Sequence, residues 1–266
     1  MIRYLLFAGF FLSCATTQKL KLPVRNTDAL SGTEFYKKIA PLKWNEREPM
    51  ILNEILSGNI PSFLRQLVPI HIQLMDSISN KNIQATFFVT RDYLAIGNSK
   101  DFVRTPMTPM LAQMIADSLH CFLPTKKLVN DIYSHARIKL APIPLVANRD
   151  SAGTFYEHQL LIEAQRKNHR GLIAGIKKDV VITSRLKDDT RNDRVAIYGW
   201  HKLDGIPIQP LYTGHINWYV DYSHGIRLIF RMILIDGKPY DYVEVLKNEK
   251  LKRLLCDEPE CNFYHY

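Results

Sequence analysis

Residues 225–245 read G-I-R-L-I-F-R-M-I-L-I-D-G-K-P-Y-D-Y-V-E-V. The run over 225–235 is rich in isoleucine, leucine and other apolar residues, which is typical of a strand. Asp236-Gly237 is among the strongest sequence signals for a two-residue hairpin turn. A returning strand is expected over 240–245. This stretch therefore predicts an antiparallel sheet in the C-terminal half of the chain.

Further strand patterns precede this hairpin. From Gly171 onward the chain has short apolar segments separated by turn residues, which indicates antiparallel strands. A lysine-rich helix over 247–255 is expected to follow the hairpin. The other strands predicted in this half lie at 172–176, 180–183, 195–200 and 217–221.

The first half has mainly helical patterns. Thr108-Pro109 supplies an N-cap and a proline at the first helical position, and Thr154 to Glu157 reads as a capping box. The predicted fold class is therefore α+β, with helices mainly in the first half and a largely antiparallel sheet in the second. Helices are expected over 46–56 and 109–119, from Pro124-Thr125 as the second arm of an αα-hairpin, and over 154–167; strands are expected over 68–74, 85–89 and 93–97.

The N-terminus is predicted to be a signal peptide. Arg3 precedes an apolar run, Tyr4 to Leu12, that is too short to span a bilayer. Ser13-Cys14 then resembles the lipobox of bacterial lipoproteins, although Phe11 and Leu12 stand where that box prefers leucine and a small residue. The resemblance covers residues 1–14 only.

This resemblance implies that residues 1–13 are removed and that Cys14 is lipidated. The protein would then be an exported, membrane-anchored lipoprotein of the cell envelope. Ala15 after the cysteine implies the outer membrane under the sorting rule of enteric lipoproteins.

The remaining chain divides into a tether and a folded body. Residues 14–32 are polar and basic and contain proline, so a flexible tether is predicted. Residues 33–266 are numerous enough for a single α+β domain. The alternative is a helical subdomain over 33–168 and a β-rich subdomain over 169–266.

The formal net charge of +9 favours an anionic partner, such as lipid head groups or an acidic glycan. The basic residues occur in short scattered clusters, for which solvated helix faces are the simpler interpretation. Nucleic acid is not expected as a partner of an exported protein. The expected partners are the membrane, through the lipid anchor, and peptidoglycan or another glycan.

The cysteines agree with export. Cys256 and Cys261 flank a turn that contains proline, so a short-loop disulfide is predicted in an oxidising compartment. Cys121 follows an apolar helix and is expected to be a buried structural thiol. A nucleophilic pair of Cys121 with a histidine would need that histidine to come from elsewhere in the fold.

Groups able to ligate a metal or move a proton are concentrated between residues 201 and 227. If His215 begins the strand over 217–221, the period of two puts His215 and Asp221 on one face, and a turn at 223–225 brings His224 back to that edge. This set, His215, Asp221 and His224, suits zinc, with a fourth position for a water that attacks an amide or ester. With His201, the same residues are the candidates for acid–base catalysis.

Other interpretations of these residues stay open. His215 and His224 can instead cap turns, with Asp221 paired to Arg227. Ser223 can be a nucleophile with His201 or His215 as base and Asp221 orienting that base, although no G-x-S-x-G motif surrounds it. Lys177, between two expected strands, can neutralise an oxyanion or a substrate carboxylate, or it can lie in a charged hairpin turn.

Two short likenesses favour cell-envelope substrates. Residues 223–228, S-H-G-I-R-L, resemble the S-H-G-C-I-R-L motif of the L,D-transpeptidases that cross-link peptidoglycan, but the nucleophilic cysteine is missing. Residues 220–223, V-D-Y-S, resemble the D-C-S segment of papain-like cell-wall amidases, with Tyr222 in place of the thiol. Because the nucleophile is missing in both, neither likeness implies the activity of its family.

The sequence thus predicts an exported, lipid-anchored protein that hydrolyses an envelope amide or glycan through a His/Asp site, with zinc as the expected cofactor if a metal is used. The alternative is a non-catalytic lipoprotein that binds glycan or a protein partner. A sugar-stacking platform for either function is offered by Trp200, Trp218, Tyr219 and Tyr222.

Overall fold

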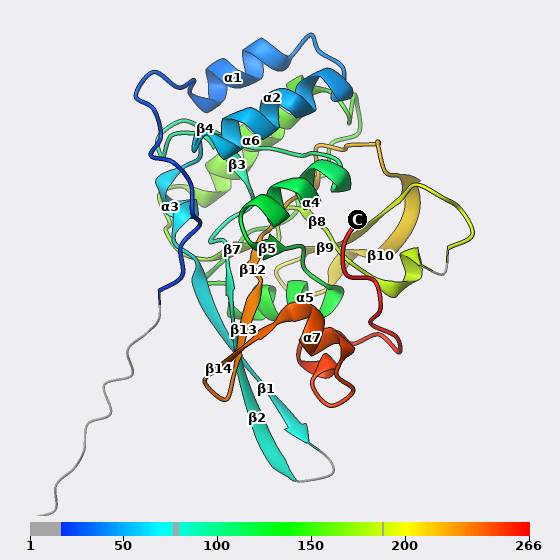
Figure 1. Ribbon diagram of the computed structural model, residues 1–266. Helices are drawn as coiled ribbons and strands as arrows, with labels where there is room; N and C mark the ends of the chain where they lie inside the picture. Colours follow the sequence, from blue (N-terminus) through cyan, green and yellow to red (C-terminus); the bar gives the residue numbers. More distant parts are fainter. Residues whose placement is uncertain (1–16, 77–79, 188) are drawn as a thin grey trace, which may run out of the picture.

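The computed structural model describes residues 17–76, 80–187 and 189–266. Cys14 and the signal peptide lie outside these residues. The α+β fold class is confirmed: helices are concentrated in the first half, and most strand pairs are antiparallel (Figure 1). The described α-helices are α1 (Gly32–Ile39), α2 (Trp44–Leu56), α3 (Ser62–Arg65), α4 (Pro109–Ser118), α5 (Lys126–His135), α6 (Ala152–Arg166) and α7 (Tyr242–Lys247).

Helices α4, α5 and α6 begin where the sequence has capping residues. The Thr108 hydroxyl accepts a hydrogen bond from the amide of Leu111 at the start of α4, at 3.2 Å, as its N-cap position predicts. Helix α6 begins earlier than expected, because Ser151 rather than Thr154 is its N-cap. No helix in the described ranges is long and apolar enough to cross a membrane.

Two main sheets are present. The larger has the order β14-β13-β2-β12-β5, with β1 added beside β2, and the smaller has the order β10-β9-β8-β11. In Figure 1 the β1–β2 hairpin extends away from the body of the molecule. The strands of the larger sheet are β1 (Val68–Asp76), β2 (Lys81–Val89), β5 (Cys121–Phe122), β12 (Ile229–Phe230), β13 (Met232–Ile235) and β14 (Lys238–Asp241). The others are β8 (Lys178–Val180), β9 (Arg194–His201), β10 (Pro207–Ile216) and β11 (His224–Gly225), with the two-stranded pairs β3 (Ala95–Gly97) and β4 (Phe102–Arg104), and β6 (Ile138–Lys139) and β7 (Ile173–Ala174).

The single strand predicted over 225–235 is broken into β11, β12 and β13. Between β11 and β12 the backbone carbonyls of Ile226 and Leu228 accept hydrogen bonds from Leu94 and Thr90, so this part of the chain passes from the smaller sheet to the larger one. The turn at Asp236-Gly237 is present and joins β13 to β14. The hairpin prediction is therefore confirmed, and the prediction of one continuous strand is wrong.

The chain after this hairpin also differs from the prediction. The expected strand over 240–245 ends at Asp241, which is the N-cap of α7 and forms a capping box with Glu244. The lysine-rich helix expected over 247–255 is reduced to a 3₁₀ turn at Lys252–Leu254. The local capping signal at Asp241 decides where the helix lies.

Residues between the two central helices form a strand rather than a simple loop. β5 separates α4 from α5 and pairs with β12, with Phe122 opposite Ile229. The predicted αα-hairpin is therefore wrong. Cys121 in this strand is a buried free thiol, and burial raises its pKa. Cys256 and Cys261 form the predicted disulfide.

Residues 17–31, which were expected to belong to a flexible tether, are packed against the body. Lys19 pairs with Gln66 as an isolated β-bridge, and Leu20 is buried. The Arg25 guanidinium donates to the side chain of Asn59 at 2.7 Å. The largest apolar cluster extends from Leu20 to Cys261 and combines residues of both halves of the chain.

Candidate functional site

The candidate site lies where the parallel strands β8 and β11 meet. His224 is opposite Lys178, and Gly225 is opposite Asp179. The strand predicted over 217–221 is wrong: β10 ends at Ile216, and the chain turns away from the sheet before it returns as β11. Two segments far apart in sequence, at 177–179 and 221–225, are thereby brought into contact.

Asp221 is the centre of this site and is fully buried. Its Oδ1 accepts hydrogen bonds from both the amide and the hydroxyl of Ser223, each at 2.7 Å. Its Oδ2 pairs with the guanidinium of Arg149 at 2.6 Å and accepts a longer hydrogen bond from the Tyr219 hydroxyl at 3.4 Å. Burial alone would raise the pKa of Asp221, but the His224 imidazole when it is protonated, the hydrogen bonds from Ser223 and the charge of Lys178 outweigh it and hold this pKa below its ordinary value.

His224 lies directly beside this carboxylate. Its side chain is buried, and its Nδ1 accepts a long hydrogen bond from the Asp221 amide at 3.5 Å. Among the described residues its buried Nε2 has no hydrogen-bond partner. Burial lowers the pKa of His224 to about 3, against the attraction of Asp221, so the imidazole is neutral at neutral pH.

His215 is half-buried near the end of β10 and belongs to the same neighbourhood. Its ring centroid is 6.1 Å from that of His224 and 4.9 Å from that of Tyr219. Burial, then the charge of Lys178, lowers its pKa. The structure thus gathers His215, Asp221 and His224. We name these three residues, with Arg149, Tyr219 and Ser223, the Asp221 cluster.

The Asp221 cluster has no obvious metal geometry. Within the described ranges, no group of three or more His, Cys, Asp or Glu side chains is arranged to hold a metal ion. Both oxygens of Asp221 already accept hydrogen bonds, and Arg149 is a cation beside the place where a metal would have to lie. Zinc at this site stays a prediction.

His201 lies apart from this cluster. Its ring stacks on Tyr133 with centroids 4.4 Å apart, and its Nε2 is 3.0 Å from the side-chain oxygen of Asn130. Burial lowers its pKa to about 4. These contacts are to α5, so its predicted role beside His215 has no geometric support.

Lys177 is buried beneath the cluster rather than placed in an exposed turn. Its ammonium group donates to the Tyr222 carbonyl and lies 3.1 Å from Nδ1 of His158. Burial lowers its pKa to about 7. His158, in the first half of α6, is fully buried. Sequence reasoning missed this pair because no motif connects α6 with the segment before β8.

Two alternatives from the sequence are not supported by the contacts. The Ser223 hydroxyl donates to Asp221 and has no imidazole partner among the described residues, so the serine-nucleophile arrangement is not formed. Arg227 does not pair with Asp221. Its guanidinium lies 3.8 Å from Asp179 and 4.1 Å from the ring centre of Tyr93.

An open cleft of about 340 Å³ lies on the other side of Tyr219. Trp218 on its wall is 47% exposed, so an indole face is available to a ligand. Tyr219 lines this cleft and also contacts Asp221. Asp150, which follows Arg149 in the chain, lines the cleft as well. We name this space the tryptophan cleft; it is lined by Ala40, Leu42, Lys43, Trp44, Arg47, Asp150, Ser151, Ala152, Trp218, Tyr219 and Val220.

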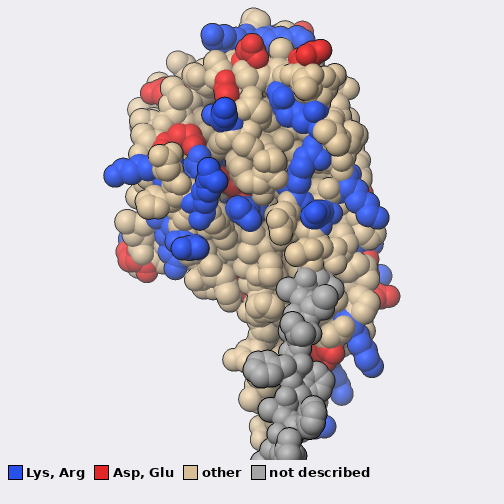
Figure 2. All heavy atoms as spheres, turned by 90° about the vertical axis from the view of Figure 1, so that its left-hand side faces the viewer, with Lys and Arg blue, Asp and Glu red and all other residues tan. Residues whose placement is uncertain are grey.

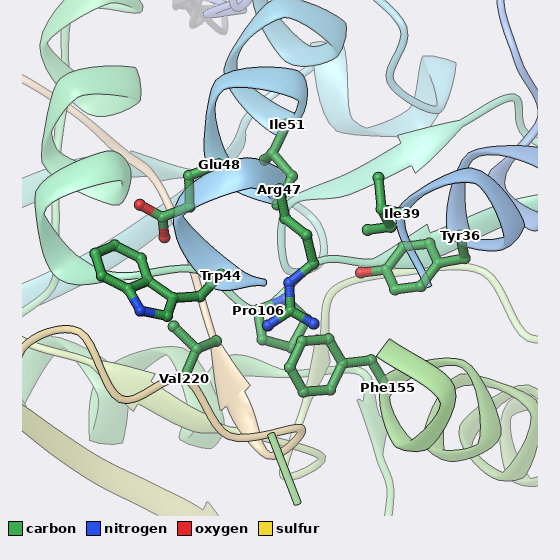
Figure 3. Close-up of a pocket in the computed structure, with 9 residues that line it drawn as sticks. All are labelled: Tyr36, Ile39, Trp44, Arg47, Glu48, Ile51, Pro106, Phe155 and Val220. Atoms are coloured by element: carbon green, nitrogen blue, oxygen red, sulfur yellow. The ribbon is translucent and has the colours of Figure 1, made fainter. Parts of the chain in front are cut away.

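Arg47 lines the tryptophan cleft and also a small separate pocket beside Phe155, which Figure 3 shows. Its side chain extends from α2 toward Phe155, and its guanidinium lies 5.3 Å from the centre of that ring. One nitrogen donates to the Asp150 carbonyl at 3.3 Å, and among the described residues no carboxylate forms a salt bridge with it. Arg47 was missed because its position in the sequence is that of an ordinary polar residue in an amphipathic helix.

Comparison with known proteins gave no relative: no family model, curated protein or solved structure matches this chain.

Proposed function

We propose that this protein is a cell-envelope hydrolase that binds an amide- or glycan-containing substrate in the tryptophan cleft. The observation that carries the proposal is the pairing of a buried neutral imidazole, His224, with a buried ionised carboxylate, Asp221, which accepts a hydrogen bond from Tyr219 on the wall of a ligand-sized cleft. Buried titratable groups with shifted pKa values that lie in contact beside a cleft are typical of acid–base sites.

In this proposal each residue has a separate role. Asp221 orients the cluster and carries the negative charge, since it accepts hydrogen bonds from Ser223 and pairs with Arg149. The free Nε2 of His224 exchanges a proton with the reacting group. Substrate reaches it when the Arg149 side chain, which is 40% exposed, moves away from Asp221. Arg47 and Trp218 hold the substrate, through a carboxylate and a sugar face respectively.

The cellular location is part of the same proposal. We infer an exported lipoprotein anchored through Cys14, and the Cys256–Cys261 disulfide supports an oxidising compartment. This location is tested by measuring how the Cys14→Ser variant is distributed between the membrane and soluble fractions of cells. Loss of the protein from the membrane fraction is expected, and unchanged fractionation would contradict the anchor.

Release of soluble fragments from purified peptidoglycan sacculi tests the enzymatic function. Asp221→Asn and His224→Gln should each lower the release by about 100-fold or more, the scale of general acid–base catalysis. His135→Gln, at an exposed histidine ending α5, is the matched control and should keep wild-type release. Melting temperatures of all variants show whether they are folded. No release by the wild-type chain contradicts the hydrolase.

A second candidate function is glycan binding without catalysis, which is favoured by the exposed indole of Trp218. Co-sedimentation with the same sacculi separates the two functions. Trp218→Ala should weaken binding under either proposal, whereas Asp221→Asn should weaken only the release. Binding by the wild-type chain without any release would support this second function.

A further inference from the structure

A second cavity, on another side of the molecule, has a strongly basic lining. It encloses about 590 Å³ between α3, the turn that joins β3 to β4, and the segment that follows α6, and none of its lining residues is shared with the tryptophan cleft. We name it the basic groove; it is lined by Ser62, Phe63, Arg91, Asp92, Ser99, Lys100, Glu163, Arg166, Lys167, Asn168, His169, Arg170, Gly171 and Ile173. Figure 2 faces this side of the molecule and shows more lysine and arginine than acidic side chains.

The two carboxylates in the groove are already neutralised. Asp92 is paired through both oxygens with Arg104, at 2.9 and 2.6 Å. Glu163 accepts a hydrogen bond from the same guanidinium at 2.8 Å and from Arg166 on its other side at 2.9 Å. Arg104 is itself almost fully buried. These acids therefore have little capacity left to neutralise other cations.

The remaining basic residues lack such partners. Within the described ranges, no salt bridge joins a carboxylate to Arg91, Lys100, Lys167 or Arg170. The Nε of Arg91 is buried, and among the described residues nothing accepts its hydrogen bond. A buried donor without an acceptor is costly, so this nitrogen marks a place where a ligand acceptor would stabilise the groove.

The C-terminal dipole of α6 accounts for only part of this charge. Cations near a helix C-terminus are favoured by the partial negative charge there, which explains Arg166 and Lys167. Arg91 and Lys100 come from other segments and converge on the same cavity. A helix-terminus effect therefore does not explain why four free cations share one concave space.

We propose that the basic groove binds a ligand that carries a phosphate group. Guanidinium groups match phosphate through paired hydrogen bonds. The four free basic side chains also carry more positive charge than one carboxylate group on a ligand would neutralise. The volume suits a small molecule or a head group, and the half-buried Phe63 offers an apolar surface to the rest of the ligand. The same phosphate chemistry occurs in a soluble phosphorylated sugar and in an anionic lipid head group.

Binding of defined probes to the full-length chain in detergent tests this proposal. Isothermal titration with glycerol 3-phosphate reports soluble phosphate ligands, and titration with phosphatidylglycerol in the same detergent, against phosphatidylcholine in it, reports head groups. Lys167→Glu/Arg170→Glu should weaken binding of the successful probe at least 10-fold. Lys238→Glu/Lys250→Glu changes the charge equally at exposed sites outside the groove and should leave affinity within twofold.

The two arms distinguish the sources of the phosphate. Binding of glycerol 3-phosphate assigns a soluble ligand, and binding of detergent-dispersed phosphatidylglycerol alone assigns a lipid. Arg91→Gln should also weaken binding, since it removes the charge whose Nε is unpartnered. The proposal is overturned if the wild-type chain binds neither probe, or if the control double variant loses as much affinity as the groove variant. Neither result bears on hydrolysis at the Asp221 cluster.

Discussion

At the scale of single residues, burial sets the properties of the candidate site. Lys177 and His224 are both almost fully buried, and in both cases burial favours the neutral form. The sequence identified both residues by their chemical type. It did not show their burial, because that depends on α6 and on β11, which are distant from Lys177 in the chain.

Lys177 gives a prediction about stability and pH. Its pKa is lowered from 10.5 to about 7 in the folded chain, so between these values the unfolded chain binds about one more proton. The free energy of unfolding therefore rises with pH in this window, by up to about 1.4 kcal/mol per pH unit. Lys177→Met should lose this contribution, as measured by urea unfolding at pH 7, 8 and 9. Lys250→Met, at an exposed lysine, should keep the wild-type slope, and identical slopes in all three chains would refute the assignment.

At the scale of elements, the parallel contact between β8 and β11 builds the site, and Gly225 makes it possible. A Cβ at this position would lie 2.5 Å from the Tyr93 ring and 2.6 Å from the Cβ of Lys177. The sequence alone does not show why a glycine is needed here, because the residues that crowd it, Tyr93 and Lys177, come from two other segments.

Gly225→Ala should therefore destabilise the chain by about 1–3 kcal/mol, the usual cost of overpacking a core. Denaturant unfolding measures this. Gly153→Ala in α6 is the matched control, because its nearest neighbour would be 3.7 Å away and alanine favours a helix by up to about 1 kcal/mol over glycine. Equal stability of Gly225→Ala and the wild type would mean that the two strands are not held this closely.

At the scale of the whole molecule, elements that depend on local signals were predicted correctly, whereas strand pairing that depends on distant segments was not. The N-cap at Thr108 and the turn at Asp236-Gly237 each depend on only a few neighbouring residues, and both are present in the structure. The division of 225–235 into three strands depends on pairing with β8, β2 and β5, which no local pattern contains. His215 and His224 do lie near each other, although the strand from which their proximity to Asp221 was argued does not exist.

The central claim is that a neutral His224 beside an ionised Asp221 carries out acid–base chemistry. The most direct measurement is the rate of fragment release from peptidoglycan sacculi between about pH 4.5 and 6.5, the range in which an ordinary histidine becomes neutral. Because the pKa of His224 is lowered to about 3, the rate should change by less than about twofold across this range. A rate that rises with an apparent pKa near that of a free histidine, or no release at any pH, would contradict the account.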